Sequence, residues 1–124
     1  MNWLPLLLVA AMVLLALIMK RTGQISAADA RALLKKGARV IDVRSPGEFN
    51  SGHLPMAVNI PLDEVETGVP RQVNDKSQPL LLHCQSGMRS GMACRKLKKA
   101  GYPNVYNLGS LARAGEIVGA PENK

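Results

Sequence analysis

The sequence is poor in cysteine, in aromatic residues and in acidic residues. Its 124 residues include two cysteines, one tryptophan, two tyrosines and one phenylalanine. Two cysteines are too few for a disulfide scaffold, and with two histidines they make a structural zinc or iron–sulfur site improbable. Few rings are available to stack bases, and no nucleic-acid-binding motif is present. We therefore expect no metal and no nucleic-acid partner.

Acidic residues are outnumbered, and the excess of positive charge suits anionic partners. Sixteen Lys and Arg stand against nine Asp and Glu, which gives a formal net charge of +7. A basic balance favours an anionic membrane surface or anionic substrates. A basic run lies at residues 95–99. It is either a solvated helix face or a surface that attracts acidic lipid headgroups, anionic donors or an acidic partner protein.

An uncharged apolar stretch opens the chain. Residues 3–19 carry no charge and would span about 26 Å as a helix, which is the short end of the transmembrane range. Lys20 and Arg21 follow at once, and no Lys or Arg precedes the stretch. A cleaved signal peptide has its positive charges on the other side. We therefore expect one uncleaved transmembrane helix over residues 1–21, in a single-pass membrane protein with the domain of residues 22–124 in the cytoplasm.

The rest of the chain alternates strand-like and helix-like segments. The pattern predicts strands at residues 39–43, 57–60, 80–83 and 104–108, and helices at residues 27–36, 45–48, 62–73, 86–100 and 110–118. Such alternation is typical of an α/β domain with a parallel sheet flanked by helices. In these sheets ligands bind beyond the carboxyl ends of the strands. Cys84 occupies such a position, directly after the strand at residues 80–83.

The segment at residues 84–90, CQSGMRS, has the composition of a reactive-thiol loop. It joins a strand end to a helix N-terminus, where backbone N–H groups have no partner within the helix. Those groups, together with the charge of Arg89, lower the pKa of a cysteine and favour its thiolate. Gly87 allows a turn that a side chain would obstruct. We therefore predict that Cys84 is catalytic rather than an inert buried thiol.

Several ordered motifs resemble the rhodanese-like sulfurtransferases, from about residue 25 to residue 117. They are VIDVR at 40–44, EF at 48–49, GHLP at 52–55, AVNIP at 57–61, CQSGMRS at 84–90, GY at 101–102 and VYNL at 105–108. The sequence departs from the family at Met56 and Ser110, where glycine is usual. These loops border the mouth of the site in the family, so the departures bear on donor preference.

The resemblance implies a rhodanese-like fold, a function and a site. Cys84 would carry sulfane sulfur as a covalent persulfide, with no other cofactor. The donor would be small and anionic, thiosulfate or a persulfide, and the acceptor a thiol or cyanide; a membrane or sulfur-relay protein is a possible partner. The backbone of the loop would cradle the persulfide, and Arg89 would orient the donor or help to ionise the thiol. The loop residues are Gln85, Ser86, Gly87, Met88 and Arg89, and the supporting polar set is Asp42, Arg44 and Glu48.

Two other functions remain open from the sequence. Relatives that hydrolyse phosphate esters or reduce arsenate resemble C-x5-R, whereas residues 84–89 read C-x4-R, a shorter loop that suits a single sulfur atom. The other alternative is a binding module at the membrane that keeps the fold without turnover. The presence of both Cys84 and Arg89 argues against it.

Two further residues near the loop are predicted to be structural. Cys94 lies about 12 Å along the helix from its start, too far from Cys84 for a disulfide, so we expect a core thiol. His83 precedes Cys84 on a strand, where neighbouring side chains point to opposite faces. We expect it to be a hydrogen-bonded core histidine rather than a base.

Overall fold

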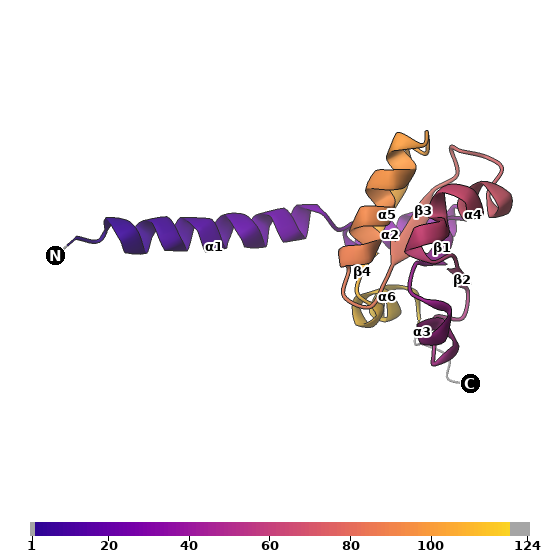
Figure 1. Ribbon diagram of the computed structural model, residues 1–124, viewed down its shortest axis with the longest axis horizontal. Coiled ribbons are helices and arrows are strands. Elements are labelled where there is room, and N and C mark those ends of the chain that lie inside the picture. Colours follow the sequence, from indigo (N-terminus) through magenta and orange to yellow (C-terminus); the bar gives the residue numbers. More distant parts are fainter. Residues whose placement is uncertain (1, 120–124) are drawn as a thin grey trace.

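The computed structural model describes residues 2–119, and for residues 18–22 it describes the backbone only. The elements follow the predicted alternation of strands and helices (Figure 1). The strands are β1 (Arg39–Asp42), β2 (Val58–Asn59), β3 (Leu80–His83) and β4 (Val105–Gly109). The helices are α1 (Leu4–Thr22), α2 (Ala27–Lys35), α3 (Pro46–Asn50), α4 (Val65–Gln72), α5 (Met88–Lys99) and α6 (Leu111–Val118), with a 3₁₀ turn at Leu62–Glu64.

The four strands form one parallel sheet in the order β2-β1-β3-β4. β3 therefore lies in the interior of the sheet, between β1 and β4. All four of its residues are buried, as expected for a parallel strand covered on both faces. Cys84 follows directly, and its N–H donates to the carbonyl of Gly109 at 3.2 Å. Cys84 thus lies just beyond the carboxyl end of β3, the strand whose residues are all buried.

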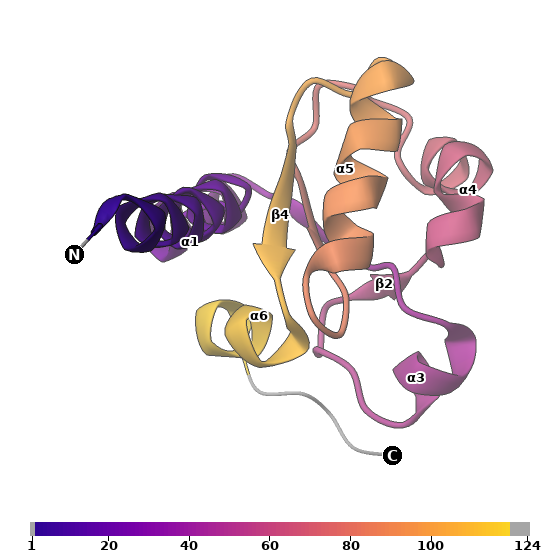
Figure 2. The same ribbon diagram turned by 60° about the vertical axis from the view of Figure 1, so that its left-hand side comes forward.

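Helices cover both faces of the sheet, and α5 and α6 lie on opposite sides of β4 in Figure 2. The sheet therefore separates the hydrophobic core into two clusters. On one face α4 and α5 pack through residues such as Val65, Val69 and Leu97. On the other face α2 and α6 pack through residues such as Ala30 and Ile117. The parallel sheet flanked by helices that the sequence predicted is confirmed.

Short polar side chains cap two helices of the domain, α2 and α3. Ser45 and Glu48 form a complete capping box at the start of α3: the Ser45 hydroxyl accepts from the N–H of Glu48, and the Glu48 carboxylate accepts from the N–H of Ser45. Ser26 caps α2 through the N–H of Asp29 at 3.1 Å. The helix predicted over residues 62–73 is shorter than expected, because its first residues form the 3₁₀ turn Leu62–Glu64 instead.

The apolar stretch at the start of the chain folds as α1, and the described side chains of residues 2–17 are all exposed. Among the residues whose side chains are described, no helix is long and apolar enough to cross a membrane, so the expected transmembrane helix is not found. The described apolar side chains of α1 end at residue 17, and residues 4–17 rise only about 20 Å along a helix. Residue 1 and the side chains of residues 18–21, which belong to that expectation, lie outside the described part.

Candidate active site

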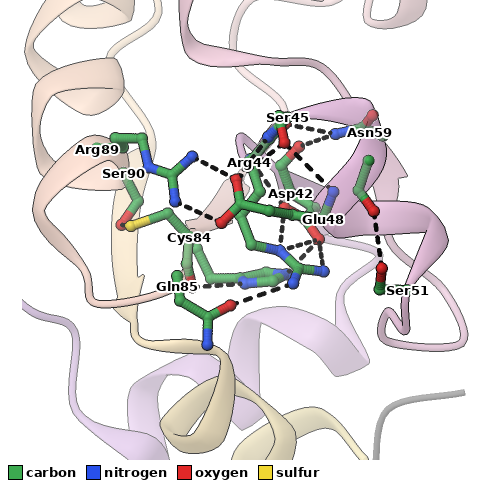
Figure 3. Close-up of polar contacts among 12 residues, drawn as sticks. Asp42, Arg44, Ser45, Glu48, Ser51, Asn59, Cys84, Gln85, Arg89 and Ser90 are labelled. Atoms are coloured by element: carbon green, nitrogen blue, oxygen red, sulfur yellow. Dashed lines mark hydrogen bonds and ion pairs between the residues drawn. The ribbon is translucent and has the colours of Figure 1, made fainter. Parts of the chain in front are cut away.

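The sulfur of Cys84 lies inside a loop whose polar groups point toward it. Cys84 is fully buried at the end of β3. The N–H of Gly87 donates to its Sγ at 2.9 Å. The hydroxyl of Ser90 lies 3.6 Å from the same atom, and Figure 3 shows the two side chains next to each other. α5 begins at Met88, so this loop is also the N-terminus of a 12-residue helix. The loop and helix start that the sequence placed around the cysteine therefore do surround its sulfur.

Gly87 is required by the shape of the loop. Its φ is +99°, a left-handed conformation that side chains rarely adopt. A Cβ at this position would also come within 3.2 Å of Gly109 Cα and of the side-chain nitrogen of Gln24. The backbone of the loop is thus pressed against β4 and against the segment that precedes α2. This close approach aims the N–H of Gly87 at the sulfur.

These contacts favour the thiolate of Cys84. Burial raises the pKa of a thiol, but hydrogen bonds from the backbone and hydroxyl of Ser90, and from the backbone of Gly87 and Ser86, outweigh it. The pKa of Cys84 is therefore lower than that of an ordinary cysteine. The residues that lower it are loop donors, and no separate base contacts the sulfur in the described part of the chain. The donors of the loop therefore favour the thiolate, which is the nucleophilic form of a cysteine.

Arg89 is paired with a carboxylate at the edge of the site. Its guanidinium donates to the two Glu48 oxygens at 2.7 and 2.9 Å (Figure 3), and both side chains are about one-third exposed. The Arg89 guanidinium, followed by the Ser45 backbone, holds the pKa of Glu48 at about 2. The same pair raises the pKa of Arg89. Glu48, which the resemblance assigns to the supporting polar set, therefore lies beside Arg89 and is partly exposed.

Asp42 and Arg44, which the resemblance assigns to the supporting polar set, form a buried ion pair. Arg44 donates to both Asp42 oxygens, with the shortest contact at 2.7 Å, and also to the carbonyl of Gly52 at 2.8 Å. Its remaining nitrogen reaches the side-chain oxygen of Gln85 at 3.3 Å. A buried charge is tolerated when it is paired and hydrogen-bonded in this way. Arg44 thus links the end of β1 to the first loop residue after Cys84.

The other loop residues differ in how far they are exposed to solvent. Gln85, Ser86 and Met88 are exposed, and Met88 keeps 76% of its surface accessible. Gly87 is buried behind them. A groove of about 850 Å³ borders the loop on one side and is lined by Met88, Arg95 and other residues of α5 and β4. The groove beside the loop therefore has both apolar and basic side chains in its lining.

The two residues predicted to be structural are buried. Burial raises the pKa of Cys94 to about 12, so this core thiol stays protonated. His83 is fully buried, and burial lowers its pKa. Its Nδ1 lies 3.3 Å from the carbonyl of Cys84. Its Nε2 has no hydrogen-bond partner among the described residues and lies 3.6 Å from Asp42. The expected core position is confirmed, and the expected hydrogen bonding holds for one ring nitrogen.

Sequence reasoning did not assign a role to Ser90 or Asn107, which both contact the loop. Asn107 on β4 accepts from the Ser90 hydroxyl at 2.6 Å and donates to the carbonyl of Gly87 at 3.1 Å. Both residues belong to the motifs that carry the family resemblance. Their contribution depends on β4 lying beside β3, a tertiary contact that local patterns do not give.

Fold and site together define a class of protein, a parallel α/β domain that presents a cradled, ionisable cysteine. Comparison with known families makes the assignment specific. The model of the rhodanese-like domain matches residues 26–112. The chain belongs to the rhodanese-like domain family.

Individual relatives agree with this assignment. Over 71 residues the chain is 39% identical to the thiosulfate sulfurtransferase PspE of Escherichia coli, covering 57% of this chain and 68% of that protein. It is 44% identical over 71 residues to YqhL of Bacillus subtilis, covering 57% of this chain and only 55% of that relative. A solved structure of a rhodanese with anions from E. coli has a TM-score of 0.65 and 33% identity, and covers 71% of this chain and all of the other. The human single-domain sulfurtransferase TSTD1 gives a TM-score of 0.64 at 29% identity, covering 76% of this chain and 96% of its own.

Proposed function

We propose that this protein is a sulfurtransferase that carries sulfane sulfur as a persulfide on Cys84. The thiolate attacks the outer sulfur of thiosulfate, the S–S bond of the donor breaks, and sulfite leaves with the bonding electrons. A thiolate or cyanide acceptor then attacks the outer sulfur of the persulfide. This second step forms a new persulfide or thiocyanate and returns the Cys84 thiolate, so no external oxidant or reductant is needed.

The observation that carries the proposal is the environment of the Cys84 sulfur. It is buried, yet the Gly87 N–H at 2.9 Å and the Ser90 hydroxyl at 3.6 Å lie around it, and its pKa is lowered. The same donors would stabilise a persulfide anion, which carries its charge on the outer sulfur. Relatives named thiosulfate sulfurtransferase support the same chemistry.

An anionic donor suits the charges at the rim. Arg89 carries a fixed positive charge, although Glu48 shares it. Along the neighbouring groove Arg95 and Lys98 add positive charge beside the exposed Met88. A groove that is both basic and apolar also suits a protein acceptor whose thiol sits beside acidic residues. The E. coli rhodanese structure is described as holding anions, which agrees with an anionic donor.

Intact-mass measurement of the full chain after incubation with thiosulfate tests the proposal. We expect the protein to gain one sulfur atom, the Cys94→Ser variant to gain it equally, and the Cys84→Ser variant to gain none. Release of the sulfur on addition of cyanide, with formation of thiocyanate, would establish transfer. If neither thiosulfate nor a small persulfide loads Cys84, the proposal fails and a binding module is favoured.

Helix α1 bears on where the domain is held. Its side chains over residues 4–17 are exposed, and nearly all of them are apolar. A helix that is apolar on every side is stable only against another apolar phase. We therefore propose that α1 lies at a membrane, with the domain on the cytoplasmic side, because Lys20 and Arg21 follow the apolar stretch. We expect the chain to stay in membranes after an alkaline wash. We also expect a reporter that works only in the cytoplasm to be active when it is fused to the C-terminus. Failure of either expectation would refute this placement.

A further inference from the structure

A buried hydrogen-bond network connects β4 to the loop that holds the sulfur. Ser90 is fully buried, and Asn107 keeps 8% of its surface accessible. The side-chain oxygen of Asn107 accepts from the Ser90 hydroxyl at 2.6 Å and from the N–H of Gly109 at 2.9 Å. Its side-chain nitrogen donates to the carbonyl of Gly87 at 3.1 Å. One amide therefore contacts both residues that hydrogen-bond to Cys84.

The Ser90 hydroxyl has one proton and several acceptors within reach. The Asn107 oxygen is 2.6 Å away, the Gly87 carbonyl 3.1 Å, and the Cys84 sulfur 3.6 Å. While Cys84 is a neutral thiol, the short contact with Asn107 is the stronger hydrogen bond. When the thiol ionises, a full negative charge lies beside the hydroxyl, and a hydrogen bond to that charge is favoured. When the proton of Ser90 turns to the sulfur, its hydrogen bond to the Asn107 oxygen is lost, and the contact of Asn107 with the loop that remains is the one from its nitrogen to the Gly87 carbonyl.

We propose that Asn107 is a positioning residue for the thiolate of Cys84. Its side-chain nitrogen donates to the Gly87 carbonyl and so fixes the residue whose N–H points at the sulfur. While Cys84 is neutral, the side-chain oxygen of Asn107 also accepts from the Ser90 hydroxyl. The inference rests on the proposed role of Cys84 as the reactive thiol. Its test, however, is the ionisation of Cys84 and does not require sulfur transfer.

An asparagine side chain suits this position because it has both an acceptor and a donor. Aspartate would supply acceptors only and would add a negative charge near the thiolate, and leucine would supply neither. The chemistry of the side chain therefore favours asparagine.

The rate of alkylation of the full chain by iodoacetamide, measured across pH, gives the pKa of Cys84. In a Cys94→Ser background we expect Asn107→Leu and Ser90→Ala each to raise this pKa by about one pH unit, close to the value of one hydrogen bond to a charge. Because both variants remove parts of the same network, the double variant should shift the pKa little more than either alone. The matched control is Asn104→Leu, since Asn104 donates to the carbonyl of Ser77 in an exposed turn.

The outcomes separate positioning from general damage. A thermal unfolding curve shows whether each variant is folded; if Asn107→Leu is not, Asn107→Ser takes its place with the same expectation. An unchanged or lowered pKa in a folded Asn107 variant would overturn the inference, as would fully additive shifts in the double variant. If the pKa rises as expected while the parent protein gains no sulfur, the inference stands and the proposed sulfur transfer fails.

Discussion

Replacing Glu48 with glutamine tests how much the rim ion pair stabilises the domain. The variant keeps the shape of the side chain but removes the charge that faces Arg89 at 2.7 and 2.9 Å. It also weakens the acceptor that completes the capping box of α3 with Ser45. We expect the variant to fold and to unfold more easily than the parent protein.

The size of the expected loss of folding stability follows from the ionisation of the Glu48 carboxyl group. Its pKa falls from 4.5 to about 2 in the folded protein. Each pH unit of this pKa difference corresponds to about 1.4 kcal/mol, so the charge of Glu48 contributes at most about 3.4 kcal/mol to the free energy of unfolding. The side chains of Arg89 and Glu48 are 36% and 35% exposed, so water and salt screen the pair. We therefore expect a loss of about 1 kcal/mol near pH 7.

The stabilisation that Glu48 provides depends on pH in a definite direction. Because folding lowers the pKa of Glu48, the stabilisation is fully present above about pH 5 and disappears as the pH falls toward 2. Thermal unfolding of the full chain in mild detergent measures it, and about 1 kcal/mol corresponds to about 4–8 °C in a domain of this size. Glu66→Gln is the matched control, because its contact with Lys96 is 3.8 Å long and exposed. An equal loss at pH 7 and near pH 2, or an equal loss in the control, would refute the reasoning.

Three further changes probe the loop and its support. Asp42→Asn should cost about 3 kcal/mol in urea unfolding because it leaves the Arg44 charge buried without its partner, and a loss below about 1 kcal/mol would contradict a buried pair. Gly87→Ala forces a side chain into a φ of +99°, so alkylation of Cys84 should slow at least several-fold; an unchanged rate would show that the loop tolerates another shape. In the parent protein near pH 8, iodoacetamide should label Cys84 and leave Cys94 unlabelled, as peptide mapping would show, because burial raises the pKa of Cys94 to about 12 whereas that of Cys84 is lowered.

The fold was predictable because its signals are local. The run of leucines before Cys84 forms a buried strand, and Ser26 and Ser45 cap helices that begin close to the predicted positions. The segment over residues 62–73 was less predictable, since Gly68 and Pro70 weaken a helix and the first turn became 3₁₀. Strand order was not given by any local pattern, because pairing depends on which helices cover each face.

Within the site, the cysteine and its loop were predictable, and their partners were less so. The motif around Cys84 pointed to the cysteine whose sulfur accepts from the Gly87 N–H, and Asp42 and Arg44 form a buried ion pair. That Arg89 pairs with Glu48 across 41 residues of sequence could not be read from either motif alone. The same holds for Asn107, whose contacts arise only when β4 lies beside β3.

The position of β4 has a consequence for the newly made chain. Cys84 leaves the ribosome before β4 does, yet the carbonyl of Gly109 and the amide of Asn107 complete its surroundings. Until β4 docks, these contacts are missing, and the loop donors that lower the pKa of Cys84 are not held in place. The lowered pKa of Cys84 is therefore a property of the folded domain and not of the loop sequence alone.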